Sequence, residues 1–125
     1  MVPILVNSVT IDCKNPGALA DFYARLLGWA VLLRNKDFVS IGTPGFPVRI
    51  GFQLNELYVP PVWPEQEGCP QQMEHLDFKA TDRADMEAIV RHAVHCGGKI
   101  APEQYSEDWT VLFDPEGHPF CIDTL

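Results

Sequence analysis

Apolar residues recur with helical spacing in two segments of the chain, each forming one stripe at positions i, i+3, i+4, i+7 and i+8. The stripes consist of Leu19, Phe22, Tyr23, Leu26 and Leu27 in the first segment, and of Met86, Ile89, Val90, Ala93 and Val94 in the second. Residues at this spacing share one face of an α-helix. The sequence therefore predicts two amphipathic helices, each burying one face.

The two predicted helices begin and end with matching signals. Asn15 and Asp82 are of the residue types preferred as N-caps, and glycines at 28 and 97 follow the last helical turns. Caps and stripes also recur at one offset, because 82 minus 15 and 86 minus 19 both equal 67. A constant offset over cap and stripe predicts a duplicated structural unit.

Segments of alternating apolar and polar residues flank both helices and predict β-strands. One precedes each helix, at 8–13 and at 75–80, again 67 residues apart. Further strands are predicted at 30–33, 38–41 and 48–54 in the first half, and at 99–101, 110–113 and 119–123 in the second. Each half thus reads β-α-β-β-β. We predict one α+β domain over 1–125, with modules at about 1–56 and 73–125 and a proline-rich linker at 57–72.

The composition narrows the range of partners. The 125 residues are 46% hydrophobic and carry a formal net charge of −8, which disfavours nucleic acid and anionic membrane surfaces as partners. The start of the chain has no signal-peptide pattern, and no apolar run has the length of a membrane span. The four cysteines form no CxxC pair, so we expect free thiols and a cytoplasmic location.

Several local sequences resemble one known superfamily over nearly the whole chain. They are the segment 15–29 (NPGALADFYARLLGW), Gly51-Phe52-Gln53, the segment 74–78 (EHLDF) and the segment 114–120 (DPEGHPF). They are similar to the vicinal-oxygen-chelate superfamily, also called the glyoxalase/bleomycin-resistance/dioxygenase fold, and to its glyoxalase-like domain subgroup. The resemblance implies two βαβββ modules that form a curved mixed sheet around a cleft, and a homodimer.

Strand alternation predicts which residues line that cleft. The apolar faces should pack on the helices, so the opposite faces should be open to a ligand. Candidate ligand-binding residues on those faces are Ser8, Thr10, Arg49, Gln53, His75, Asp77 and Cys121, edged by Trp29, Trp63 and Trp109. Three other histidines are expected to be exposed: His92 and His95 on the second helix, and His118 in the last turn.

Enzymes of the resembled superfamily usually hold a divalent metal with one ligand from each of four strands. Carried over by position, these places fall on Ser8, on Gly51 or Gln53, on His75 and on Cys121. His75 alone is a standard ligand in its place, so we predict no metal and no other cofactor. If a divalent metal does bind, His75 and Cys121 are its expected ligands. The alternative interpretation of Cys121 is a small buried residue, as most free cysteines are.

Three functions follow from these observations. The first is a binder of a small molecule in the sheet cleft, without the usual metal. The second is a glyoxalase-like lyase, isomerase or hydrolase in which His75 is the catalytic acid or base and Arg49 or Lys79 holds an anion. The third is a non-catalytic interaction domain.

Overall fold

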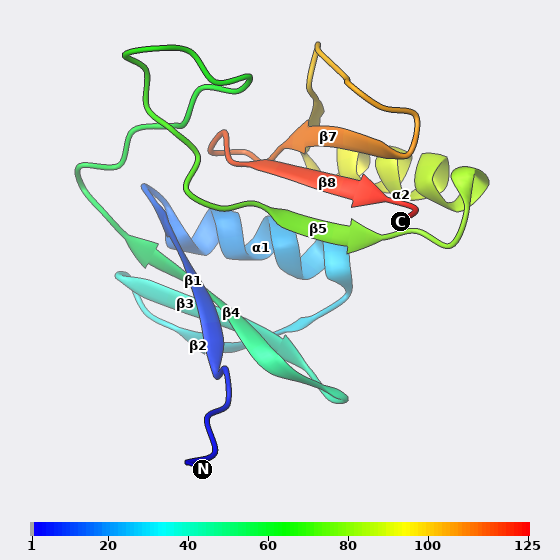
Figure 1. Ribbon diagram of the computed structural model, residues 1–125. Coiled ribbons are helices and arrows are strands. Elements are labelled where there is room, and N and C mark those ends of the chain that lie inside the picture. Colours follow the sequence, from blue (N-terminus) through cyan, green and yellow to red (C-terminus); the bar gives the residue numbers. More distant parts are fainter. Residues whose placement is uncertain (1) are drawn as a thin grey trace. The chain divides into compact units, whose positions relative to one another are not determined.

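The computed structural model describes residues 2–125 and contains two four-stranded mixed sheets, each accompanied by one helix (Figure 1). The chain divides into two compact units, one ending at Tyr58 and the other beginning at Val59. This boundary falls within the predicted linker, and most of the linker belongs to the second unit. The α+β class and the two βαβββ modules are confirmed.

The first unit contains β1 (Ser8–Cys13), α1 (Pro16–Leu27), β2 (Ala30–Arg34), β3 (Phe38–Thr43) and β4 (Phe46–Leu54). The strand order is β1-β4-β3-β2, with β1 parallel to β4 and the other pairs antiparallel. As predicted, the Asn15 side chain caps α1 by accepting from the Ala18 N–H, and Gly28 ends the helix with φ of 69°. Glycine suits this left-handed position because it has no Cβ.

The predicted apolar stripe of α1 packs against its sheet. Leu19, Phe22 and Tyr23 are almost fully buried, as are Ile41 and Phe52 on the strands. The Tyr23 and Phe52 rings stack with centroids 5.5 Å apart. Burying these side chains removes apolar surface from water, which is the main driving force for the fold.

The second unit repeats this arrangement with β5 (Leu76–Lys79), α2 (Arg83–Cys96), β6 (Lys99–Ile100), β7 (Trp109–Phe113) and β8 (Pro119–Asp123). The strand order is β5-β8-β7-β6, with β5 parallel to β8. Asp82 caps α2 by accepting from the Asp85 N–H, and Gly97 ends the helix. Both predicted helices therefore begin and end where the sequence indicated. Neither helix of the described residues has the length and apolar character needed to cross a bilayer.

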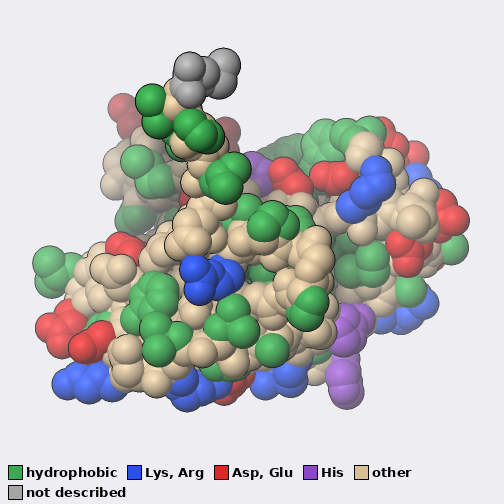
Figure 2. Space-filling model, turned by 90° about the horizontal axis from the view of Figure 1, so that it is seen from below, with side chains coloured by type: hydrophobic (Ala, Val, Ile, Leu, Met, Phe, Trp, Pro, Cys, Tyr) green, Lys and Arg blue, Asp and Glu red, His purple; other side chains and the backbone are tan. Residues whose placement is uncertain are grey.

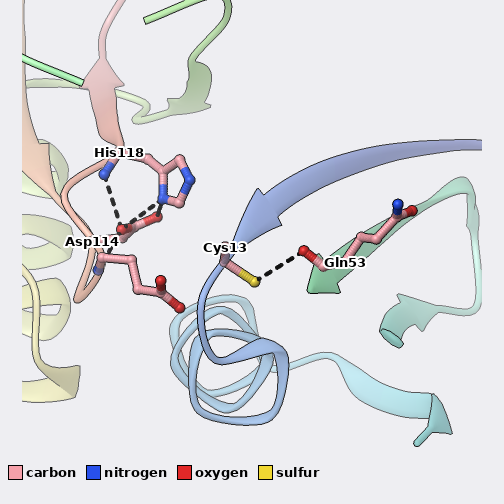
Figure 3. Close-up of polar contacts among 5 residues, drawn as sticks. Cys13, Gln53, Asp114 and His118 are labelled. Atoms are coloured by element: carbon pink, nitrogen blue, oxygen red, sulfur yellow. Dashed lines mark hydrogen bonds and ion pairs between the residues drawn. The ribbon is translucent and has the colours of Figure 1, made fainter. Parts of the chain in front are cut away.

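The turn between β7 and β8 corrects one prediction. His118 was expected to be exposed, but its side chain is only 11% exposed and its Nδ1 lies 2.7 Å from Asp114 Oδ2 (Figure 3). The buried Asp114 carboxylate also accepts from the backbone N–H groups of Glu116 and His118. The turn folds around this carboxylate, which draws the histidine ring inward. The two helix histidines, His92 and His95, are exposed as predicted.

Candidate functional site

The parallel pairing of β5 and β8 brings the candidate residues of the second unit together. The register places Asp77 opposite Cys121 and Lys79 opposite Asp123. Directly opposed residues in neighbouring strands point to the same side of a sheet. Leu76 and Phe120 form another opposed pair and take the other face. Asp77 and Cys121 therefore share the face that alternation predicted to be polar.

A pocket of about 380 Å³ lies over this face. It contains His75, Asp77, Trp109 and Cys121, four of the candidates from the second module, together with Trp63 from the predicted linker. The lining consists of Trp63, Gln72, His75, Asp77, Tyr105, Trp109, Val111, Pro119, Cys121, Asp123 and Leu125. Lys79, the neighbouring cation of β5, lies outside this lining.

The floor of the pocket combines an imidazole, two carboxylates and a thiol. His75 Nε2 lies 3.4 Å from Asp77 Oδ1, and both side chains are about half exposed. Burial raises the pKa of the Cys121 thiol to about 12, with further increases from the charge of Asp77, a hydrogen bond with Asp77 and the charge of Asp123. The thiol is therefore protonated at neutral pH and is a poor nucleophile in this state.

The walls of the pocket are aromatic. Trp63 meets Tyr105 edge-on with ring centroids 5.6 Å apart. Trp63 and Trp109 also pack against the buried cluster of Ala101, Val111 and Cys121. Trp63 comes from the proline-rich segment that the sequence predicted to be a linker, and the structure makes this segment a wall of the pocket.

Several lining residues were not predicted from the sequence, and Gln72 and Tyr105 are two of the polar ones. Both lie in segments without strand or helix periodicity, so alternation could not assign them to a face. A second hollow of about 470 Å³ shares Trp63 and Gln72 with the pocket and is otherwise lined by the chain between Val62 and Gln71. The Gln72 Oε1 atom is buried and has no hydrogen-bond partner among residues 2–125.

The candidates of the first unit lie on one face of its own sheet. The β1–β4 register places Ser8 opposite Arg49, Thr10 opposite Gly51 and Asp12 opposite Gln53. The alternation argument thus grouped them as the structure does. A shallow hollow in this unit includes Asp12, Phe38 and Gln53 but not Ser8, Thr10 or Arg49.

Two other first-unit candidates have local partners. The Arg49 guanidinium donates to the Asn7 side-chain oxygen at 3.0 Å. Trp29 packs on Phe46 with ring centroids 5.4 Å apart and lies outside the hollow. In the same sheet, the Cys13 thiol donates to the backbone carbonyl of Gln53 at 3.6 Å (Figure 3). This contact involves the backbone of Gln53 and not its side-chain amide.

The usual set of four metal ligands of the superfamily is incomplete in this chain, because positions 8 and 51 lack a suitable side-chain donor. At position 51 a Cβ atom would lie 2.6 Å from the Phe38 ring, so the aromatic ring fills the space that a ligand side chain would need. Ser8 offers a neutral hydroxyl, which is a poor ligand for a divalent ion.

A different set of donors lies within the second unit. The ligand atoms of His75, Asp77 and Cys121 are all within 4.8 Å of one another. Imidazole, carboxylate and thiolate are the ligand types of zinc. Any zinc-type ion at the pocket floor would be held by these three residues, and it would have to displace the proton of the Cys121 thiol.

Comparison with known proteins agrees with the architecture. A family model described as a glyoxalase-like domain matches residues 8–122. The structure is similar to a glyoxalase/bleomycin resistance protein/dioxygenase family enzyme from Burkholderia phytofirmans PsJN, at 22% identity and a TM-score of 0.70, covering 94% of this chain and 95% of that one.

Two further solved structures are similar. A glyoxalase-related enzyme from Fulvimarina pelagi has 18% identity and a TM-score of 0.70, with 95% of this chain and 86% of that chain covered. A glyoxalase family protein from Enterococcus faecalis has 23% identity and a TM-score of 0.65, with 95% and 96% covered. At these identities the likeness shows the fold alone. No curated protein matches the sequence.

Proposed function

The chain belongs to the glyoxalase-like domain family, and from that premise we propose that it binds a small molecule in the pocket of its second unit, without the divalent metal usual in the superfamily. The observation that carries the proposal is the pocket of about 380 Å³ with aromatic walls and a polar floor. Small-molecule sites are typically concave, mostly apolar and equipped with a few polar groups that orient the ligand.

The walls and the floor of the pocket have different roles in binding. Trp63 and Trp109 offer aromatic surface against which an apolar or planar ligand can pack. His75 and Asp77 offer polar groups at the floor, where a ligand can form directional hydrogen bonds. In this arrangement the walls supply most of the binding energy and the floor selects the orientation of the ligand.

We also propose a cytoplasmic location for the protein, because its four cysteines are free thiols.

The test adds aromatic and cationic metabolites to chelator-treated protein. Binding is measured by thermal shift and by isothermal titration calorimetry. A ligand of this pocket should bind more weakly when Trp109 is replaced by leucine. Trp29→Leu is the matched control, because Trp29 packs on Phe46 in the other unit. An equal loss of ligand affinity in the two variants, or the absence of any binding ligand, would contradict the proposal.

Metal analysis of protein purified without chelator provides a second, independent check. We expect less than stoichiometric metal, because two of the four usual positions lack a suitable donor. Stoichiometric zinc, nickel or iron that is lost in both His75→Ala and Cys121→Ala would overturn the metal-free proposal. Each variant removes one of the three donors at the pocket floor.

A glyoxalase-like enzyme is the second candidate, and the 3.4 Å approach of His75 to Asp77 favours it. A carboxylate beside an imidazole can orient the ring and stabilise its protonated form during proton transfer. If a reaction is found, His75→Ala should lower its rate at least about a hundredfold if His75 is the acid or base. A much smaller loss would remove His75 from that role.

A further inference from the structure

The two adjoining hollows of the second unit have a one-sided charge. Four carboxylate residues line them: Asp77 and Asp123 in the pocket, and Glu65 and Glu67 in the neighbouring hollow. Neither lining includes a lysine or an arginine. A concave site lined by one sign of charge concentrates ligands of the opposite sign, because its low-dielectric walls focus the field.

Asp77 and Asp123 both lie beside Cys121 on the side of the sheet that forms the pocket floor. Two carboxylates close together on the floor favour a cation there. Lys79 is the nearest cation along β5, but it lies outside the pocket lining and no ion pair with Asp123 is formed within 4 Å among residues 2–125.

The aromatic walls also favour a positive charge. Trp63, Tyr105 and Trp109 all line the pocket, and the faces of indole and phenol rings attract ammonium and guanidinium groups. The Tyr105 hydroxyl already donates to Glu103 at 2.9 Å, so this carboxylate adds negative charge beside the aromatic wall. Aromatic rings together with nearby carboxylates form a site suited to a cation with an apolar body.

Gln72 indicates which kind of cation fits. Gln72 lines both hollows, and its buried Oε1 atom is an acceptor without a hydrogen-bond partner among the described residues. A buried acceptor left unpaired is costly, and a rotation of the Gln72 side chain that brought this oxygen to a ligand N–H would relieve that cost. Asp77 and Asp123 are acceptors as well. The site therefore favours a cation that donates hydrogen bonds over a quaternary ammonium, which has no N–H.

We propose that the ligand of this pocket is an organic cation with N–H donors on an aromatic or apolar body, of the arylalkylammonium or arylguanidinium class. The ammonium or guanidinium group would lie among Asp77, Asp123 and Gln72, and the apolar body would lie against Trp63 and Trp109. This inference rests on the proposed function, because it specifies the ligand class of the same pocket.

The test uses matched probes that share a skeleton and differ in charge. One set is 2-phenylethylammonium, 2-phenylethanol and 3-phenylpropionate, and a second is benzamidinium, benzamide and benzoate. Each is titrated into chelator-treated full-length protein while the three tryptophan indole N–H signals are followed by NMR. We expect the cations to shift the Trp63 and Trp109 signals and to bind at least about tenfold more tightly than their neutral partners.

Variants separate recognition of charge from a general effect on the fold. Asp77→Asn and Asp123→Asn should each weaken cation binding about tenfold, whereas Glu87→Gln, which removes the same charge from the exposed face of α2, should not. Gln72→Met should weaken cation binding about threefold or more without lowering the free energy of unfolding, because it removes an unpaired acceptor. A purely structural role of Gln72 would not produce that combination.

The outcomes distinguish the two proposals. If neutral or anionic probes bind as tightly as the cations and shift the same indole signals, the inference fails and the proposed function stands. If no probe of any charge shifts those signals, both fail. A cation affinity that depends on added Zn²⁺, or that survives Asp77→Asn and Asp123→Asn together, would also overturn the inference.

Discussion

The Cys121 side chain illustrates how one residue acquires its chemistry from its neighbours. The sequence left it open between a metal ligand and a small buried residue. In the structure it is 9% exposed, and it shares the pocket floor with Asp77 and Asp123. Burial and two nearby carboxylates hold the proton on sulfur, so Cys121 contributes a neutral, weakly polar surface to the pocket.

This environment predicts the reactivity of the thiol. With a pKa of about 12, about one Cys121 thiol in a thousand is ionised at pH 9, so alkylation by iodoacetamide should be slow and should accelerate as the pH rises. The charge of Asp77 favours the protonated form, so Asp77→Asn should lower the pKa and speed alkylation at a given pH. Mass spectrometry of chelator-treated protein measures the rate at Cys121, and Glu87→Gln serves as the charge control. Equal rates in wild type and Asp77→Asn would contradict this account.

At the scale of elements, local signals predicted the helices better than the strands. An N-cap side chain satisfies a backbone N–H within three residues, so Asn15 and Asp82 can be recognised without knowing the rest of the fold. Strand ends depend on the neighbouring strand. β5 begins at Leu76 rather than at position 75, and β6 has only two residues, because pairing with β8 and β7 decides how far each ladder extends.

The Asp82 cap should contribute measurably to stability. Its side chain accepts a hydrogen bond from the Asp85 N–H at 2.8 Å. In Asp82→Ala this N–H, at the start of α2, would lose its side-chain acceptor and could bind only water. We expect the free energy of unfolding to fall by about 1 kcal/mol in urea denaturation. Glu87→Ala, an exposed change in the same helix, should stay within about 0.5 kcal/mol of wild type. Equal effects in the two variants would show that the cap is not the cause.

At the scale of the whole molecule, some surfaces remain apolar despite a net charge of −8. β2 is one of the two edge strands of the first sheet, and its Leu32 and Leu33 are 53% and 52% exposed. The segment before β1 also exposes Ile4 and Leu5, and Figure 2 shows hydrophobic side chains, coloured green, on the surface. An exposed apolar edge strand offers unpaired backbone groups to another chain.

We propose on this basis, and from the family resemblance, that the protein is a homodimer. Analytical ultracentrifugation should give a mass near twice the 14.0 kDa of one chain. If β2 contributes to the interface, Leu33→Lys should shift the equilibrium towards monomer. Lys36→Glu in the turn after β2 also alters an exposed side chain and serves as the control. A monomer at all concentrations would contradict the homodimer.

The sequence by itself determined the repeated βαβββ order, both helix caps and the polar face of each sheet, because hydrophobic spacing and capping are local properties of the chain. It could therefore group His75, Asp77 and Cys121 before the structure placed them around one pocket. Only the tertiary structure brought Gln72 and Tyr105 to that pocket and placed the Phe38 ring over Gly51. These positions depend on how irregular segments and side chains pack on the sheets, and packing between residues distant in the chain has no periodic signature in the sequence.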